Sequence, residues 1–229
     1  QVEIILKAWN EQSFAHRGKH YDIPPKVPIR QGVLEEITLV PRPLHLPVEI
    51  WQPITSSTQR GLEFMAKHGV NGVIVGGTAP GGRAETLASG YRDVMQRAGR
   101  HTEFGESIAL GVQIHMADTQ EKAMREAVLF HEEQVKALAP LGRIPALTKE
   151  QIRATADPDK APFAGLPTIE SMVEEGSWIC GPPEHVGEKI ADIQDRFPGL
   201  ERIFVHTGGL GIPPRIMRED LKCFAAEVM

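Results

Sequence analysis

Cysteine, long apolar runs and an excess of basic residues are all missing from this sequence. Two cysteines, Cys180 and Cys223, are too few for a disulfide framework and lack the spacing of a zinc site, so we predict no metal and a reducing, cytoplasmic compartment. No apolar stretch approaches the roughly 20 residues of a membrane-spanning helix, so we expect no membrane partner. The net charge of −5 argues against a basic stripe for nucleic acid.

An initiator methionine and a signal-peptide pattern are also missing, and the chain opens with QVEIILKAW already in helical period. We therefore expect the chain to begin inside a helix. Its 229 residues, 41% of them hydrophobic, suffice for one sizeable core and predict a single domain, 1–229. Along it we expect a helix end plus a hairpin-like excursion (1–47), three βα units (48–138), a linker with at most one short helix (139–177), and a last helix–strand–helix unit (178–229).

The most informative stretch is VEIWQPITSSTQRGLEFMAKHGVNGVIVGG, which predicts one βαβ unit. Its parts are a buried strand (Val48 to Ile54), a hydroxyl-rich turn (Thr55, Ser56, Ser57, Thr58), a helix (about Gln59 to His68) and a second strand (Val70 to Val75). Ligands of parallel sheets sit at the carboxyl ends of strands, where this turn falls. Because the turn opens a helix, it is a candidate anion site, and an ordinary helix cap is the alternative.

Two further strands are predicted, and each of the four strands is followed by a helix. The strands are centred near residues 50, 73, 111 and 204, and the later helices run over Arg83–Ala98, from Asp118 or Thr119 to Leu138, over Pro183–Phe197, and from Pro214 onward. This alternation predicts a parallel α/β sheet of four βα units, half of an eight-fold barrel. The glycine-dense loop after the second strand lacks a tight GxGxxG, so we interpret it as a mobile loop rather than a dinucleotide site, and whether it faces a ligand stays open at this point. His206, at the end of the last strand, either faces a ligand or is a core histidine, and we favour the core.

Several segments together resemble the C-terminal part of the bacterial luciferase-like flavin monooxygenases. They are EIILKAWNEQSFAHRGKHYDI, PRPLHLPVEIW, the hydroxyl turn with LEFMAKHG, GPPEHVGEKIADIQDRFPGLERIFVH, and PPRIMREDLKCFAAEVM. The resemblance implies a (β/α)8 TIM-type barrel of which this chain holds about the C-terminal half. It also implies a monooxygenase that uses reduced FMN, supplied by a separate flavin reductase, and O2 to oxygenate a small organic substrate.

The same resemblance implies which residues hold the cofactor. Ser57 and Thr58, with Ser56 as a neighbour, match the hydroxyls that hold the flavin phosphate after the fifth strand. Gly61 stands where some relatives have another hydroxyl, and Trp51 and Gln52 would approach the flavin or the pocket wall. Catalytic residues of the family belong to its first four strands, so no catalytic residue is assigned here.

Two alternative functions remain open. A sister branch of the family uses a deazaflavin coenzyme for hydride transfer instead of oxygenation. The other alternative is a non-catalytic half-barrel that self-associates and buries its open sheet edges against a second copy, and a homo-oligomer is expected in either case.

Overall fold

In the computed structural model, residues 1–144, 147–207 and 210–229 are described, and the chain divides into two compact units, residues 1–50 and 51–229. The first unit contains the predicted helix, α1, and two short antiparallel hairpins in place of the single one expected. Outside these hairpins, Ile37 forms an isolated bridge to Phe14. The elements are α1 (Val2–Asn10), β1 (His16–Arg17), β2 (Asp22–Ile23), β3 (Pro28–Ile29) and β4 (Gly32–Val33).

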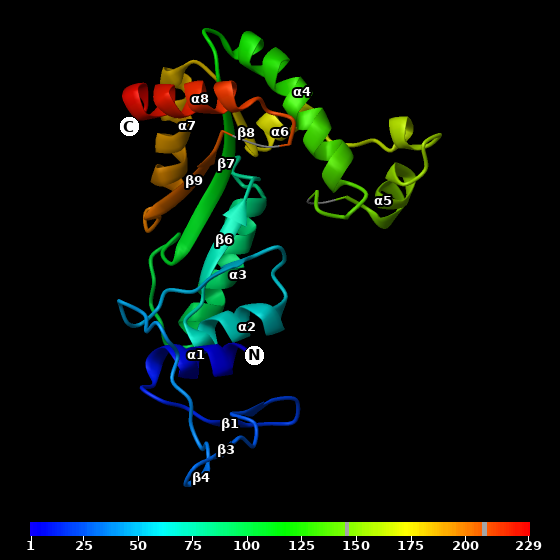
Figure 1. The fold of residues 1–229 in the computed structure, drawn as a ribbon. Coiled ribbons are helices and arrows are strands. Elements are labelled where there is room, and N and C mark those ends of the chain that lie inside the picture. Colours follow the sequence, from blue (N-terminus) through cyan, green and yellow to red (C-terminus); the bar gives the residue numbers. More distant parts are fainter. Residues whose placement is uncertain (145–146, 208–209) are drawn as a thin grey trace. The chain divides into compact units, whose positions relative to one another are not determined.

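The second unit carries the predicted alternation of strands and helices (Figure 1). Its strands are β5 (Trp51–Pro53), β6 (Asn71–Val75), β7 (Ile108–Met116), β8 (Trp178–Gly181) and β9 (Arg202–His206). Its α-helices are α2 (Gln59–His68), α3 (Arg83–Arg97), α4 (Gln120–Leu138), α5 (Lys149–Thr155), α6 (Ile169–Glu174), α7 (Pro183–Arg196) and α8 (Pro214–Glu227), and η1 (Ala161–Phe163) is a short 3-10 helix.

All the strand pairs of the second unit are parallel, which confirms the predicted parallel α/β sheet. The four predicted strands are β5, β6, β7 and β9, side by side in that order, with β7 in the centre. The shorter β8 pairs with the carboxyl-terminal part of β7. Since Gln113 pairs with Trp178 of β8 and with His206 of β9, these two strands flank β7 on opposite edges.

The first strand of this sheet is shorter than predicted, and it is not buried. β5 begins only at Trp51, because that residue pairs with Asn71 and the neighbouring strand has no earlier residue to pair with. Gln52 and Pro53 are exposed, whereas Ile54, which continues the ladder by donating its N–H to the Val73 carbonyl at 2.8 Å, is buried. Residues before β5 therefore reach the sheet as irregular chain.

The core lies against the central strand β7, whose Ile108, Leu110, Val112 and Ile114 are 2% exposed or less. Alternate residues of β8 face opposite sides of the sheet: Trp178 and Cys180 pack against α4, while Ile179 faces α7. Helix α3 contributes a buried stripe, as its periodicity predicts: Ala84, Leu87, Ala88, Tyr91, Val94 and Met95. Helices thus cover β8 on both faces.

Over β6 and β9, by contrast, one face of the sheet is open. Val75 and Phe204 both pair with Gly111 and so lie on the same face, and each side chain is 46% exposed. On the opposite face of β6, Gly72 and Ile74 are buried. We call this uncovered surface, around Val75, Gly111 and Phe204, the open face.

The segment between α4 and β8 is more structured than predicted. Instead of a linker with at most one short helix, it holds α5, η1 and α6. Helices α5 and α6 both begin with a capping box, in which the hydroxyl of Thr148 or Thr168 accepts the third helical N–H and the third side chain bonds back. These capping hydrogen bonds stabilise the two short helices. The proline-rich composition of the segment had favoured a linker instead.

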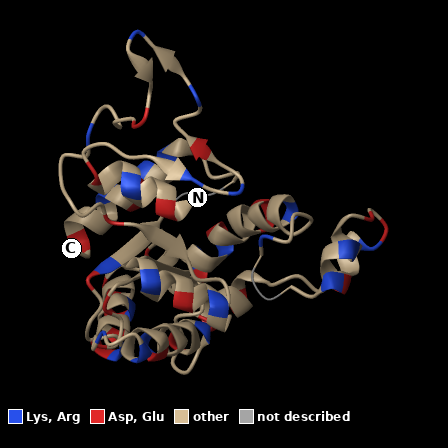
Figure 2. Cartoon of the chain, turned by 90° about the horizontal axis from the view of Figure 1, so that it is seen from below, with Lys and Arg blue, Asp and Glu red and all other residues tan. Residues whose placement is uncertain are grey.

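Charged residues are mixed on the surface of the chain. Figure 2 shows Lys and Arg interspersed with Asp and Glu along the helices. Because the charges are mixed, an anion site on this chain must depend on local groups rather than on a broad basic surface.

Among the described residues, no helix combines the length and apolar character needed to cross a membrane.

Candidate functional site

The hydroxyl turn sits between β5 and α2, as predicted. Thr58 is the N-cap of α2, with extended backbone angles, and its carbonyl accepts the N–H groups of Gly61 at 3.0 Å and Leu62 at 3.1 Å. Its side chain, however, makes no capping hydrogen bond to the helix. The ordinary helix-cap interpretation requires such a bond, so the structure leaves the Thr58 hydroxyl free for another acceptor or donor.

The neighbouring hydroxyls are free in the same way. In residues 1–144, 147–207 and 210–229, the side chains of Ser56, Ser57 and Thr58 form no hydrogen bond, and all three are exposed. Gly61 lies on the first turn of α2, and a Cβ there would come within 3.0 Å of the Thr58 hydroxyl oxygen. Three free hydroxyls and an unobstructed helical N-terminus form a site suited to an anion.

A guanidinium that the sequence did not single out lies beside this turn. Arg83, the first residue of α3, donates from Nη2 to the Thr55 carbonyl at 3.1 Å and from Nη1 to the Val75 carbonyl at 3.4 Å. Thr55 directly precedes the hydroxyls. Sequence reasoning missed Arg83 because it falls 28 residues after Thr55, in a loop noted only for its glycines.

Two of the predicted cofactor residues are not brought to the turn. Trp51 is the first residue of β5, pairs with the first residue of β6, and has the Arg202 guanidinium 4.8 Å from its ring centroid. Gln52 follows it and points to the opposite face of the sheet. The structure therefore places Ser56, Ser57, Thr58 and Gly61 at the turn and the start of α2, and Trp51 and Gln52 on the preceding strand with their side chains on opposite faces of the sheet.

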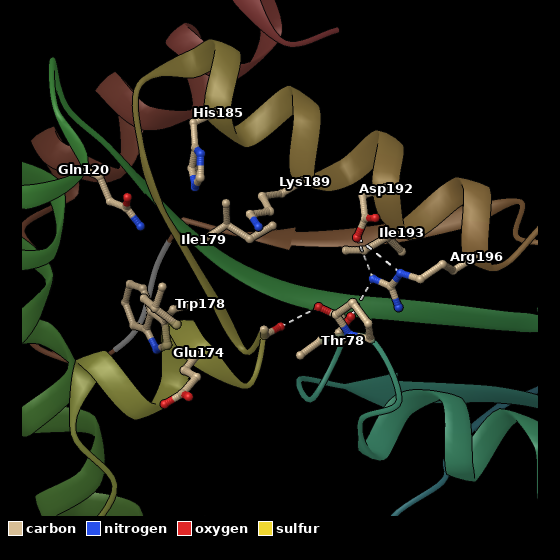
Figure 3. Close-up of a pocket in the computed structure, with 14 residues that line it drawn as sticks. Thr78, Gln120, Glu174, Trp178, Ile179, His185, Lys189, Asp192, Ile193 and Arg196 are labelled. Atoms are coloured by element: carbon tan, nitrogen blue, oxygen red, sulfur yellow. Dashed lines mark hydrogen bonds and ion pairs between the residues drawn. The ribbon is translucent and has the colours of Figure 1, made fainter.

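A cavity of about 380 Å³, lined by both charged and apolar side chains, lies between α7 and the segments Thr78–Pro80 and Val173–Ile179 (Figure 3). Its most prominent cation, Arg196, is already satisfied: Nη1 contacts Glu85 at 2.6 Å, and Nη2 contacts Asp192 at 2.9 Å and the Thr78 carbonyl at 2.7 Å. Burial alone lowers the pKa of Arg196, but the carboxylates of Glu85 and Asp192 raise it overall. Arg196 therefore ties α3, α7 and the loop after β6 together rather than offering charge to a ligand.

A second cavity, of about 950 Å³, lies between α4 and the segment Thr155–Glu170. Its lining is mainly apolar and includes the buried His131, whose Nε2 lies 2.7 Å from the Pro167 carbonyl. The sequence gave no sign of this cavity, because the opposing wall comes from a segment expected to be linker. A cavity of this size and polarity suits a small apolar molecule.

A buried histidine lies at the carboxyl end of β7. His115 is 4% exposed, with Nδ1 3.0 Å from Asp220 of α8 and Nε2 2.9 Å from Glu126 of α4. Burial alone lowers the pKa of His115, but the two carboxylates outweigh it and raise the pKa above the usual 6.5. Both ring nitrogens are occupied, so the group links three elements and has no free position for a substrate proton. His206, by contrast, is exposed on β9 and is not the core histidine we favoured.

Metal ligation has no support in the described part of the chain, where no cluster of three or more His, Cys, Asp or Glu residues has a suitable arrangement. Cys180 is fully buried, and desolvation raises the pKa of its thiol to about 12, so it is no nucleophile. The hydroxyl turn and the apolar cavity beside α4 remain as the two candidate sites.

Comparison with known families and structures gives a consistent result. Residues 1–198 match the family described as luciferase-like monooxygenase. No curated protein matches the chain. Solved structures with the same fold include the monooxygenase RslO1 from Streptomyces bottropensis, with 19% identity, a TM-score of 0.66 and 99% of this chain covered.

Two further structures differ in their cofactors. The oxygenating constituent of 3,6-diketocamphane monooxygenase from Pseudomonas putida, in complex with FMN, has 19% identity and a TM-score of 0.61 over 99% of this chain. An F420-dependent secondary alcohol dehydrogenase, in complex with an F420–acetone adduct, has 12% identity and a TM-score of 0.63 over 100% of this chain. The chain spans only 58% of RslO1, 60% of the diketocamphane enzyme and 58% of the alcohol dehydrogenase.

Proposed function

The chain belongs to the luciferase-like monooxygenase family, and from that premise we propose that it is part of an FMN-dependent monooxygenase that holds the flavin phosphate at the hydroxyl turn. Members of this family are flavin-dependent oxidoreductases that act on small molecules. The single observation that carries the proposal is the set of free hydroxyls of Ser56, Ser57 and Thr58 at the start of α2. When bound, reduced FMN supplies the electrons that activate O2 for insertion into an organic substrate.

The residues present fit the phosphate end of such a cofactor. Hydroxyl groups and the first N–H groups of a helix are donors for a dianionic phosphate, and the dipole of α2 favours negative charge at this end. Gly61 keeps the space next to the Thr58 hydroxyl open. In this proposal Ser57 and Thr58 bind the phosphate, Ser56 supports them, and Gly61 leaves room for it.

For the rest of the flavin site we propose fewer contacts from this chain. Trp51 and Gln52 point to opposite faces of the sheet, so at most one of them contacts the flavin or the pocket wall. The open face, with Val75 and Phe204, would be the inside of a (β/α)8 barrel of which this chain contributes about the C-terminal half as one domain. No residue of this chain is assigned a catalytic role.

Hydride transfer with a deazaflavin is the second candidate, and the F420-dependent alcohol dehydrogenase with this fold favours keeping it. Both cofactors carry a phosphate, so the hydroxyl turn serves either. Oxygen uptake separates the two: reduced FMN with a reductase partner consumes O2 in the first case, and the deazaflavin reaction does not. A self-associating chain without flavin affinity is the non-catalytic alternative.

The proposal is tested by fluorescence titration of FMN, oxidised and reduced, into the chain. The double variant Ser57→Ala/Thr58→Ala loses two donors to a charged group, so we expect its dissociation constant for FMN to rise about tenfold or more. The control is Thr86→Ala, an exposed hydroxyl on α3 that already donates to the Gly82 carbonyl at 3.2 Å. Equal FMN affinity in all three proteins, or no binding in any, contradicts the proposal.

A further inference from the structure

We propose that Arg83 is the charged contact of the hydroxyl turn and makes the chain select phosphorylated flavins over the dephosphorylated form. The inference rests on the proposed function, because it concerns the same phosphate. It adds the one component that the hydroxyl turn lacks, a fixed positive charge.

Arg83 is positioned by two strand ends. Its guanidinium donates to the carbonyls of Thr55, after β5, and Val75, the last residue of β6. Both carbonyls lie at the carboxyl edge of the sheet, the edge at which parallel α/β folds bind ligands. Hydrogen bonds to these two main-chain carbonyls hold the guanidinium of Arg83 in place, and one of them, that of Thr55, directly precedes Ser56. The side chain therefore loses little entropy when an anion binds.

The approach of Arg83 depends on the backbone of the glycine-dense loop. Gly77 has a φ of +69°, and a Cβ at this position would lie 2.8 Å from the Cβ of Arg83. The loop can fold over the end of β6 only because this residue has no side chain. The glycines of the loop thus serve to bring α3, and with it Arg83, to the hydroxyl turn.

The charge of Arg83 is not neutralised within the described chain. No carboxylate forms an ion pair with it there, whereas Arg196 contacts Glu85 and Asp192. Glu175 lines the same cavity of about 220 Å³ as Arg83, but its carboxylate accepts the Ser177 hydroxyl at 2.6 Å instead. A partly buried guanidinium with donors to spare, beside three free hydroxyls, is the arrangement that recognises phosphate.

The alternative role for Arg83 is purely structural, as a cap for two strand carbonyls. Arg42 provides the matched control, because its guanidinium also donates to main-chain carbonyls, those of Ala8 and Trp9 at 3.3 Å each, without any hydroxyl turn nearby in its unit. Losing a capping arginine affects every ligand alike through stability. Losing a phosphate contact affects only ligands that carry the phosphate.

The experiment compares FMN with riboflavin, which has the same ring and no phosphate, by fluorescence titration of wild type, Arg83→Gln, Arg83→Lys and Arg42→Gln. We expect Arg83→Gln to weaken FMN about tenfold or more and riboflavin less than about twofold. Arg83→Lys, which keeps the charge but not the planar fork, is expected to fall between wild type and Arg83→Gln. Arg42→Gln is expected to leave the ratio of the two affinities at the wild-type value.

A second readout separates failure of this inference from failure of the proposed function. Inorganic phosphate is expected to raise the melting temperature of the wild type and of Arg42→Gln but not of Arg83→Gln, whether or not flavin binds. If FMN binds and Ser57→Ala/Thr58→Ala weakens it while Arg83→Gln does not, the inference about Arg83 is wrong and the proposed function stands. If no flavin binds but phosphate stabilises only proteins with Arg83, the anion site stands and the flavin function is wrong. Absence of both effects in the wild type overturns the inference.

Discussion

At the scale of single residues, the clearest electrostatic effect is on the pKa of His115. Its imidazole lies between Asp220 and Glu126, which together raise its pKa in the folded chain above the ordinary 6.5. A raised folded-state pKa contributes stability that is fully present below the unfolded pKa and is lost as pH rises through the folded value. The triad therefore stabilises the fold in mildly acidic solution and progressively less in alkaline solution.

Replacing His115 by Gln tests this consequence. At pH 6 the variant leaves two carboxylates near a neutral amide, so we expect it to lose about 2 to 3 kcal/mol of unfolding free energy in urea denaturation. As pH rises through the raised folded-state pKa of His115, the wild type loses the imidazolium charge, and the difference should shrink. The control, Lys122→Gln on α4, removes an exposed pair with Asp118 and should change the unfolding free energy far less across the same pH range. A difference that grows with pH would refute the assignment of the raised pKa.

Some of the site residues were visible in the sequence, and others were not. Consecutive hydroxyls between a strand and a helix are a local pattern, so Ser56, Ser57 and Thr58 could be predicted as candidates from the sequence. Asp220 lies on α8, where it is buried while the neighbouring Leu221 is 49% exposed. Its partner His115 is 105 residues away in the sequence, and no local periodicity reports such a contact.

At the scale of elements, the loop after β6 packs closely against the residues just before β8, and this contact requires a glycine. Gly176 has a φ of +77°, and a Cβ there would lie 2.5 Å from the backbone nitrogen of Ala79. Thr78 crosses the same gap, donating its hydroxyl to the Gly176 carbonyl at 2.6 Å. Close main-chain contact at this point fixes the loop that leads into α3.

A pair of alanine substitutions separates two costs of adding a side chain at Gly176: the strain of its left-handed backbone and the clash with neighbouring atoms. Gly99 has nearly the same φ, +79°, with open space around it, so Gly99→Ala should cost only the backbone penalty of about 1 kcal/mol. Gly176→Ala adds a clash with main-chain atoms and should cost about 3 kcal/mol or more in urea denaturation. Equal losses would mean that the contact between the two loops is not tight.

Element boundaries followed the sequence closely where periodicity and capping agreed. Helix α2 runs over the predicted Gln59–His68 and ends at Gly69, whose left-handed backbone stops the helix. Prediction failed between α4 and β8, because α5 and α6 are too short to show a periodic stripe. The large cavity beside α4 was missed for the same reason.

At the scale of the whole fold, the sheet of the second unit has an apolar face that the described helices of that unit leave uncovered. Val75 and Phe204, each 46% exposed, lie on either side of Gly111 on the open face. An exposed apolar surface of this kind favours association with another surface, and the strands β5 and β9 at the edges of the described sheet add unpaired main-chain groups. We therefore expect the isolated chain to self-associate through the open face.

Substituting Val75→Ser and Phe204→Ser together should shift the chain towards monomer in sedimentation velocity. Both side chains are already half exposed, so the folded monomer should lose no more than about 1 kcal/mol per site. Leu129→Ser with Leu141→Ser is the control, because those side chains are 66% and 68% exposed and lie outside the open face. The same sedimentation profile for both double variants and the wild type would argue against association through this surface.

The central claim, that the hydroxyl turn binds the phosphate of a flavin, is tested most directly by amide NMR of the labelled chain during titration with FMN and then with riboflavin. FMN should shift the amide signals of Ser56 to Gly61 most strongly, and riboflavin should shift these same signals much less. Shifts that cluster instead around α4 and the segment Thr155–Glu170 with either ligand would place the flavin in the large apolar cavity and contradict the claim.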